Sequence, residues 1–146
     1  MEKDHNKIEF LEEYFQKVDR RIKQINVEDL IPAHGDAHFR NLIYGPKGWV
    51  WIDFEDASLM PPYWDLASAL FRTYLYDESR EISTHLINEF LVNEQSMESF
   101  ELALSARTVA SMVFNMLYSL EHQYDSAEID LLIDRGYELL DEMLLK

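Results

Sequence analysis

The sequence predicts a mainly helical α+β domain that carries one short β-hairpin. Five stretches repeat apolar residues every three or four positions, which is the pattern of amphipathic helices. Residues 30–62 break that pattern, because they hold three of the four glycines and the prolines. The chain has 146 residues and no cysteine. It therefore fits a single domain, residues 1–146, without disulfide bonds.

The N-terminal segment, residues 4–25, is expected to form the first helix. Its apolar residues recur at helical spacing: Ile8, Leu11, Tyr14, Phe15, Val18, Ile22 and Ile25. A β-hairpin follows, with strands at residues 41–44 and 49–52 joined by the turn Gly45-Pro46-Lys47-Gly48. Core packing around this hairpin is the expected role of the three tryptophans, Trp49, Trp51 and Trp64.

Two helices are predicted directly after the hairpin region. The first begins near Tyr63, after two prolines, and runs to about Tyr76. The second ends near Asn93, and Asp77 or Ser79 has the side-chain chemistry to cap its N-terminus.

The C-terminal third of the chain predicts two more helices. A long one begins at Ser96 or Ser99 and continues to about His122. Its middle, residues 109–120, is apolar on nearly every side, so we expect it to be the buried central helix. Ser126 is expected to begin the last helix, which is amphipathic.

The charge of the chain excludes some classes of partner. Thirteen basic and 28 acidic residues give a net charge of −15, which disfavours binding to nucleic acid. No stretch is long and apolar enough to span a membrane, and the charged N-terminus does not resemble a secretory signal, so a cytoplasmic location is expected. An acidic cleft would favour a cationic small molecule.

Polar residues cluster where the predicted secondary structure is irregular. The segment before the hairpin reads His34-Gly35-Asp36-Ala37-His38-Phe39-Arg40-Asn41, and Asp53 follows the second strand. Four residues separate Asp36 from Asn41, as in the H-x-D-x-x-x-x-N catalytic loop of kinases. A carboxylate can accept the proton of an attacking hydroxyl, and Mg²⁺ prefers carboxylate and amide oxygens as ligands. The hairpin would place Asn41 and Asp53 together at its open end.

Three sequence blocks occur in order: His34-Gly35-Asp36-x4-Asn41, then residues 51–57 (W-I-D-F-E-D-A), then residues 64–67 (W-D-L-A). Over residues 30–72 this pattern resembles the aminoglycoside phosphotransferase and choline kinase-like family. Members of that family share a protein-kinase-like fold, in which such a hairpin carries the catalytic loop in the C-terminal lobe. The resemblance implies an ATP-dependent enzyme that transfers phosphate to a hydroxyl of a small molecule.

The resemblance also implies roles for individual residues of these blocks. Asp36 would be the catalytic base, and His34 would support the catalytic loop. Asn41 and Asp53 would bind Mg²⁺ and, through it, the phosphates of ATP. Both cofactors, Mg²⁺ and ATP, are expected on this ground alone.

Three further residues are candidates near this site. By the same resemblance, Asp65 at a helix start would hydrogen-bond the backbone of the catalytic loop, and Glu55 would influence metal or substrate binding. His38 is expected to pack behind the site. His34 and His38 also form an H-x3-H pair, but the sequence offers no third His or Cys at a spacing that would complete a zinc site.

The sequence departs from complete kinases before the catalytic loop. Only 33 residues precede His34, and neither a G-x-G-x-x-G loop nor a V-A-I-K-like strand is found. We therefore expect the catalytic C-terminal lobe without its nucleotide-binding N-terminal lobe. The expected partners are a hydroxyl acceptor of cationic character and either a second copy of the chain or the missing lobe.

Two other functions compete with the phosphotransferase. A kinase-derived lobe of this kind would also serve as a non-catalytic, acidic helical binding module. A metallophosphoesterase is suggested by Gly35-Asp36-Ala37-His38, although the additional His and Asp clusters of that class are missing from the sequence.

Overall fold

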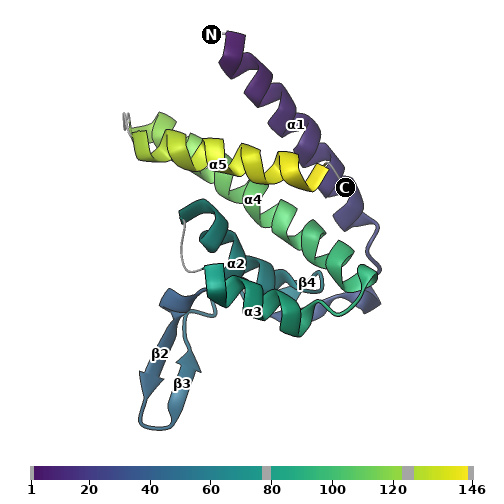
Figure 1. Ribbon diagram of the computed structural model, residues 1–146, viewed down its shortest axis with the longest axis vertical. Helices are drawn as coiled ribbons and strands as arrows, with labels where there is room; N and C mark the ends of the chain where they lie inside the picture. The colour runs from purple at the N-terminus through teal and green to yellow at the C-terminus, as the bar shows by residue number, and fades with distance from the viewer. Residues whose placement is uncertain (1, 77–79, 123–126, 145–146) are drawn as a thin grey trace.

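The computed structural model describes residues 2–76, 80–122 and 127–144, and this part of the chain is mainly helical (Figure 1). Short strands form two separate antiparallel pairs, so the structure agrees with the predicted α+β class. The helices are α1 (Glu2–Lys23), α2 (Trp64–Tyr76), α3 (Arg80–Phe90), α4 (Glu94–His122) and α5 (Ala127–Leu144). None of the described helices is long and apolar enough to cross a membrane.

The predicted hairpin is present. Its first strand begins and ends one residue later than predicted, and its second strand begins and ends one residue earlier. It pairs β2 (Leu42–Gly45) with β3 (Gly48–Trp51), so that Leu42 lies opposite Trp51. Gly48 has a φ of +105°, a conformation that glycine adopts without strain in such a turn. The hairpin projects away from the helices in Figure 1.

A second strand pair was not predicted. It joins β1 (Ile31–Ala33) to β4 (Ser58–Met60) and thereby brings the two ends of the polar segment together. Three residues are too few for an alternating pattern to be recognised in the sequence. Two short 3₁₀ helices, Val27–Asp29 and Phe39–Asn41, flank β1 and lead into β2.

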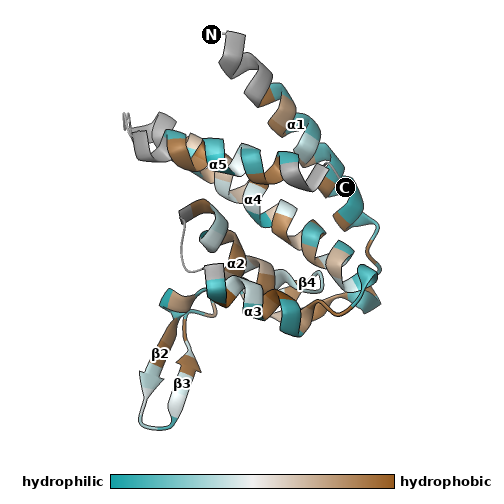
Figure 2. Ribbon diagram, viewed as in Figure 1, coloured by the Kyte–Doolittle hydropathy of each residue, from teal (hydrophilic) through white to brown (hydrophobic). Residues whose placement is uncertain are grey.

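Helix α4 is the centre of the hydrophobic core. One group of buried residues joins it to α2 and α5: Ala67, Leu70, Phe71, Leu75, Phe100, Ala103, Leu104, Leu132 and Leu139. A second group joins it to α1 and α5: Leu11, Tyr14, Val18, Leu102, Ala106, Val109, Met112 and Leu140. Figure 2 shows the matching alternation of hydrophobic and hydrophilic residues along α1 and α5. These contacts fix α2, whose first turn supports the candidate site.

The predicted buried stretch of α4, residues 109–120, is confirmed for Val109 and Met112 and wrong for several described residues after them. Burial is concentrated between Phe100 and Met112, whereas Val113, Leu117 and Tyr118 are exposed and Phe114 has 67% of its surface accessible. Helices α1, α2 and α5 pack against the earlier part of α4, and within the described residues they leave one side of its later part open. An apolar composition on every side does not indicate which side a neighbouring helix will cover.

The N-terminus of α4 also differs from the prediction that Ser96 or Ser99 caps it. The Asn93 side-chain oxygen accepts a hydrogen bond from the backbone N–H of Ser96 at 2.8 Å, and Ser96 Oγ accepts one from the backbone N–H of Asn93 at 3.0 Å. This reciprocal pair makes Asn93 the cap, with Ser96 three residues inside the helix. The proposed caps Asp77, Ser79 and Ser126 lie outside the described residues.

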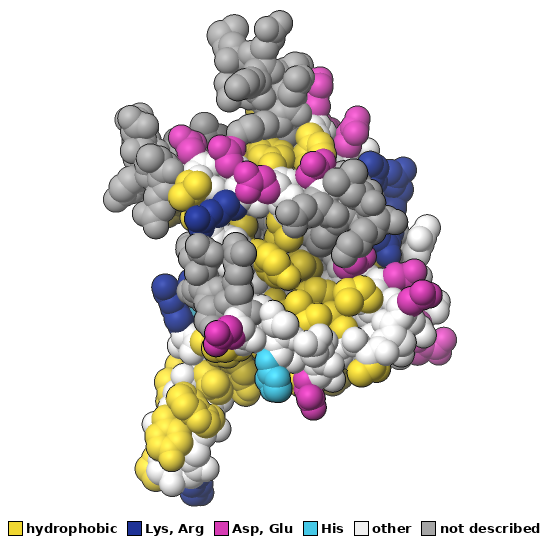
Figure 3. All heavy atoms as spheres, in the orientation of Figure 1, with side chains coloured by type: hydrophobic (Ala, Val, Ile, Leu, Met, Phe, Trp, Pro, Cys, Tyr) yellow, Lys and Arg dark blue, Asp and Glu magenta, His cyan; other side chains and the backbone are white. Residues whose placement is uncertain are grey.

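The expectation that all three tryptophans pack in the core is wrong for Trp49 and Trp51, and Trp51, whose ring contacts His34, has 39% of its surface exposed. Trp49 lies on the projecting hairpin with 67% of its surface exposed, and its ring contacts Tyr44 edge-on. Figure 3 shows that hydrophobic side chains cover much of this hairpin. Trp64, by contrast, is partly buried at the start of α2 and packs against both core groups.

Candidate functional site

The loop of residues 34–36 is held by the first turn of α2. The Asp65 carboxylate accepts hydrogen bonds from the backbone N–H groups of His34 at 2.8 Å and Gly35 at 3.0 Å. Trp64 Nε1 donates to the Gly35 carbonyl at 2.9 Å. Gly35 has a φ of +89°, and a Cβ atom there would collide with the backbone carbonyl of Asp56. The structure thus places Asp65 at the loop backbone, and only glycine fits the neighbouring position.

His34 links this loop to the open end of the hairpin. Its Nε2 lies 2.8 Å from the carbonyl oxygen of Ile52, to which it donates, because a carbonyl can only accept. The buried ring contacts the rings of Trp51 and Phe54, with centroids 5.4 and 4.4 Å away. Its Nδ1 has no hydrogen-bond partner among the described residues. The hydrogen bond from Nε2 ties the loop to the residue directly before Asp53.

Asp36 is held by two partners from different parts of the chain. Arg107 Nη2, from α4, donates to its Oδ1 at 2.7 Å, and His38 Nε2 lies 3.3 Å from its Oδ2. The Asp36 side chain is 31% exposed, so the carboxylate remains accessible. Each carboxylate oxygen has two lone-pair directions, so both oxygens can accept a further hydrogen bond while these contacts persist.

His38 faces Asp36 as a neutral donor. Its Nδ1 accepts a hydrogen bond from the backbone N–H of Arg40 at 3.2 Å, so in the neutral ring the proton is on Nε2, toward Asp36. Burial lowers the pKa of His38, and the charges of Arg72, Arg40 and Arg107 lower it further, while Asp36 opposes the shift. His38 therefore orients Asp36 through a hydrogen bond at neutral pH.

Asn41 and Asp53 lie at the open end of the hairpin, as the sequence predicted. Asn41 is buried at the end of the second 3₁₀ helix, and its carbonyl accepts a hydrogen bond from Ile52 N–H at 2.9 Å. Its side-chain nitrogen donates to the Asp36 carbonyl at 3.1 Å, which leaves the amide oxygen available to a cation. Asp53 is exposed, with a φ of +66°.

The chemistry of this pair fits Mg²⁺, because an amide oxygen and a carboxylate are both hard oxygen donors. Among the described residues, no group of three or more His, Asp or Glu side chains is arranged to hold a metal ion. Glu55 is exposed between Asp53 and Asp56. The rings of His34 and His38, which form the H-x3-H pair, are engaged by Ile52 and Asp36 instead.

A hollow of about 450 Å³ opens beside Asp36, between the loop and helices α2 and α4. Asp36 and His38 line it from the loop, Arg72 lines it from α2, and Ser111 and Asn115 line it from α4. A small molecule in this space would contact the Asp36 carboxylate directly. The hollow is therefore the candidate acceptor site.

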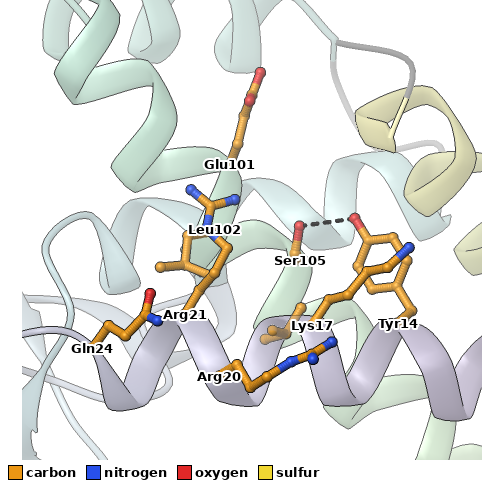
Figure 4. A pocket seen from close by; sticks show the side chains of 9 residues that line it. Tyr14, Lys17, Arg20, Arg21, Gln24, Glu101, Leu102 and Ser105 are labelled. Carbon is orange, nitrogen blue, oxygen red and sulfur yellow. Dashed lines mark hydrogen bonds between the residues drawn. The ribbon is translucent and has the colours of Figure 1, made fainter.

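A second hollow, of about 380 Å³, lies between α1 and α4 (Figure 4). Lys17, Arg20 and Arg21 line it, and Tyr14 is hydrogen-bonded to Ser105 at 3.2 Å beside it. Its lining includes no residue of the loop or the hairpin. We therefore do not assign it to the candidate active site.

The matching family model agrees with the sequence pattern and with this geometry. It is that of the phosphotransferase enzyme family, and it matches residues 2–99. The chain belongs to this family. The match includes the loop, both strand pairs and the Asp65 anchor of the phosphotransferase. A comparison with curated proteins finds no significant match.

Two arginines of the candidate site, Arg72 and Arg107, were not predicted from the sequence. Arg107 is 71 residues from Asp36 in the chain, so no local motif includes both. One signal was present, because Arg107 is the one charged residue between Glu101 and Glu121. A lone charge in an apolar helix segment indicates a buried partner or a site.

Proposed function

We propose that this phosphotransferase is ATP-dependent and transfers the γ-phosphoryl group to a hydroxyl of a small molecule. The observation that carries the proposal is the placement of Asp36. Its carboxylate is fixed by Arg107 at 2.7 Å, faces a hollow of about 450 Å³, and belongs to a loop whose backbone is bonded to Asn41. A base, a metal-ligand pair and a space for the acceptor therefore adjoin one another.

In this proposal Asp36 is the catalytic base. The acceptor hydroxyl donates a hydrogen bond to Asp36 and attacks the γ-phosphorus, the bond to the β-phosphate oxygen breaks, and ADP leaves. The hydroxyl proton passes to Asp36. Arg107 and His38 keep the carboxylate oriented, while Asp65 and His34 hold the loop against α2 and the hairpin. Most of the catalytic effect would come from positioning.

The oxygen atoms of Asn41 and Asp53 would hold Mg²⁺, which when bound neutralises charge on the phosphates. We further propose that the chain provides the C-terminal lobe of a protein-kinase-like fold. A nucleotide-binding lobe, from elsewhere in the protein or from a partner, would then strengthen nucleotide binding, whereas Asn41 and Asp53 would bind a metal–nucleotide complex weakly without it. We also propose that the reaction takes place in the cytoplasm.

A paramagnetic nucleotide complex tests this proposal on the chain as it is. Mn²⁺-ADP is titrated into the isotopically labelled protein, and line broadening is recorded for every assigned amide. We expect broadening centred on Asn41 and Asp53, and its loss in Asp53→Asn. Asparagine tolerates the positive φ of Asp53, so the substitution removes charge without straining the backbone. Asp130→Asn, on the exposed side of α5, is the matched control.

Broadening that is absent from a folded protein, or that Asp53→Asn and Asp130→Asn affect equally, would contradict the proposal. The non-catalytic acidic binding module would then be the better description of this chain.

A further inference from the structure

The second hollow, of about 380 Å³ between α1 and α4, has a positive lining on an acidic chain (Figure 4). Lys17, Arg20 and Arg21 line it from α1, and they share one face of the helix because residues three and four positions apart are neighbours there. Glu101 is the only carboxylate among the described residues that line it. Three positive side chains therefore stand against one negative side chain, whereas the whole chain has a net charge of −15.

The three basic side chains keep N–H groups available to a ligand. Within the described part of the chain, none of them forms an ion pair with a carboxylate. Arg20 Nε donates to the Gln16 carbonyl at 3.1 Å, which leaves both of its terminal Nη groups. Lys23 differs from them, because it is paired with Asp19 at 2.7 Å and lies outside the hollow. The helix dipole favours basic residues in the last turn of α1, but Lys17 lies before that turn.

Buried side chains of both helices form the floor of the hollow. Tyr14 and Ser105 are hydrogen-bonded to each other at 3.2 Å, and each is 6% exposed. Burial raises the pKa of Tyr14, so its hydroxyl keeps its proton at neutral pH and adds no negative charge. Val18 and Leu102 provide apolar surface beside this pair. The hollow thus combines a positive rim with a neutral floor that is partly apolar, a mixture that suits a small molecule with one anionic group.

We propose that this hollow binds a small phosphate monoester. Its phosphate group lies among Lys17, Arg20 and Arg21, and its organic part lies against the apolar floor. Each guanidinium can bind two oxygens at once and the lysine adds a point charge, so this set matches the three terminal oxygens of a phosphate better than the two of a carboxylate. The inference is independent of the proposed phosphotransfer, because no residue of the loop or the hairpin lines the hollow.

The test compares phenyl phosphate, benzoate and phenol, which share a ring and differ in their polar group, with inorganic phosphate as the probe that lacks the ring. Each is titrated into the chain at constant ionic strength while the amide signals of residues 14–24 and 101–105 are followed. We expect phenyl phosphate to bind most tightly, at least about tenfold more tightly than phenol, with benzoate between them. Inorganic phosphate should bind more weakly than phenyl phosphate. Phenol or benzoate binding as tightly as phenyl phosphate would overturn the proposal.

Substitutions on the exposed face of α1 locate the binding. Arg21→Gln is expected to weaken binding of phenyl phosphate by about tenfold, and Arg21→Lys should restore part of it. Lys23→Gln removes the same charge from the same helix outside the hollow, so it is the matched control and should change binding less than about twofold. Equal effects of Arg21→Gln and Lys23→Gln would show that the general field of α1 attracts the anion, and the proposed site would be wrong.

The signals of residues 34–41 separate this site from the candidate active site. Phenyl phosphate should shift them less than it shifts residues 14–24, and larger shifts at 34–41 would place the anion at the loop and overturn the proposal. The wild-type series of probes tests the hollow even if a variant does not fold. Phenyl phosphate binding that depends on Arg21, together with no Mn²⁺-ADP binding at Asp53, would refute phosphotransfer and leave this site standing.

Discussion

Replacing Asp65 with alanine tests whether the first turn of α2 holds the catalytic loop in place. The carboxylate accepts two backbone hydrogen bonds, at 2.8 Å from His34 N and 3.0 Å from Gly35 N. Hydrogen bonds to a charged group contribute about 1.5 kcal/mol or more each, so their loss costs about 3 kcal/mol. An acidic residue in the first turn of a helix adds about 0.3–1 kcal/mol. The free energy of unfolding should therefore fall by about 3–4 kcal/mol.

Urea unfolding measures this loss, with Asp130→Ala as the control for a carboxylate near the start of another helix. The expected change lowers the unfolding midpoint by about 1–3 M, whereas the control should shift it by much less. Asp65→Asn keeps one acceptor oxygen and should lose roughly half as much stability. Hydrogen exchange of the His34 and Gly35 amides locates the effect, because both should exchange roughly 100-fold faster in Asp65→Ala.

The argument would be refuted by a change below about 1 kcal/mol with unaltered exchange at those two amides. It would also be refuted if Asp130→Ala were as destabilising as Asp65→Ala. The loop would then be held by packing around the Trp64 ring, and Asp65 would contribute only through the helix dipole.

Three further predictions follow from single contacts. Gly35→Ala should destabilise the protein by about 2 kcal/mol or more, since its Cβ would collide with the Asp56 carbonyl at a positive φ; an unchanged urea midpoint would exclude this clash. Gly136→Ala should lower the melting temperature, because its Cβ would lie 2.6 Å from Sδ of buried Met112. Overpacking costs about 1–3 kcal/mol, which exceeds the gain of about 1 kcal/mol in helix propensity. A higher melting temperature would contradict this prediction. Burial lowers the pKa of His38 in the folded state, so the unfolded chain binds a proton first as the pH falls below about 6.5, and stability should decrease in that range. His38→Gln should flatten this part of the stability profile, and an unchanged slope would show that other groups cause it.

The parts of the site that the sequence predicted are those encoded within a short segment. The motif from His34 to Asn41 and the hairpin after it are contiguous, and a turn with two glycines fixes how the strands return. Asp53 then follows β3, so its proximity to Asn41 is a consequence of strand register. Each strand bound shifted by one residue, and the first strand begins later because Asn41 bonds back to the His38 carbonyl in a 3₁₀ turn and therefore precedes the strand.

The parts that the sequence did not predict depend on contacts between distant segments. The pairing of Ile31–Ala33 with Ser58–Met60 joins strands that are each too short to show a period. The ion pair between Arg107 and Asp36 depends on how α4 packs against α2, which the helical periodicity of either segment does not specify. Periodicity predicts that a helix has a buried face, whereas the partner of that face is set by the packing of the whole core.

The charge of the acceptor hollow shows why a global property predicts a local site poorly. Most of the acidic side chains that the structure describes are exposed, and solvent and salt screen them within about 10 Å. The hollow is instead governed by the side chains that α2 and α4 turn toward Asp36, and these include Arg72 and Arg107. The net charge of −15 therefore does not determine the charge that a ligand experiences beside Asp36, because the ion pair between Asp36 and Arg107, at 2.7 Å, acts at much shorter range than the exposed carboxylates.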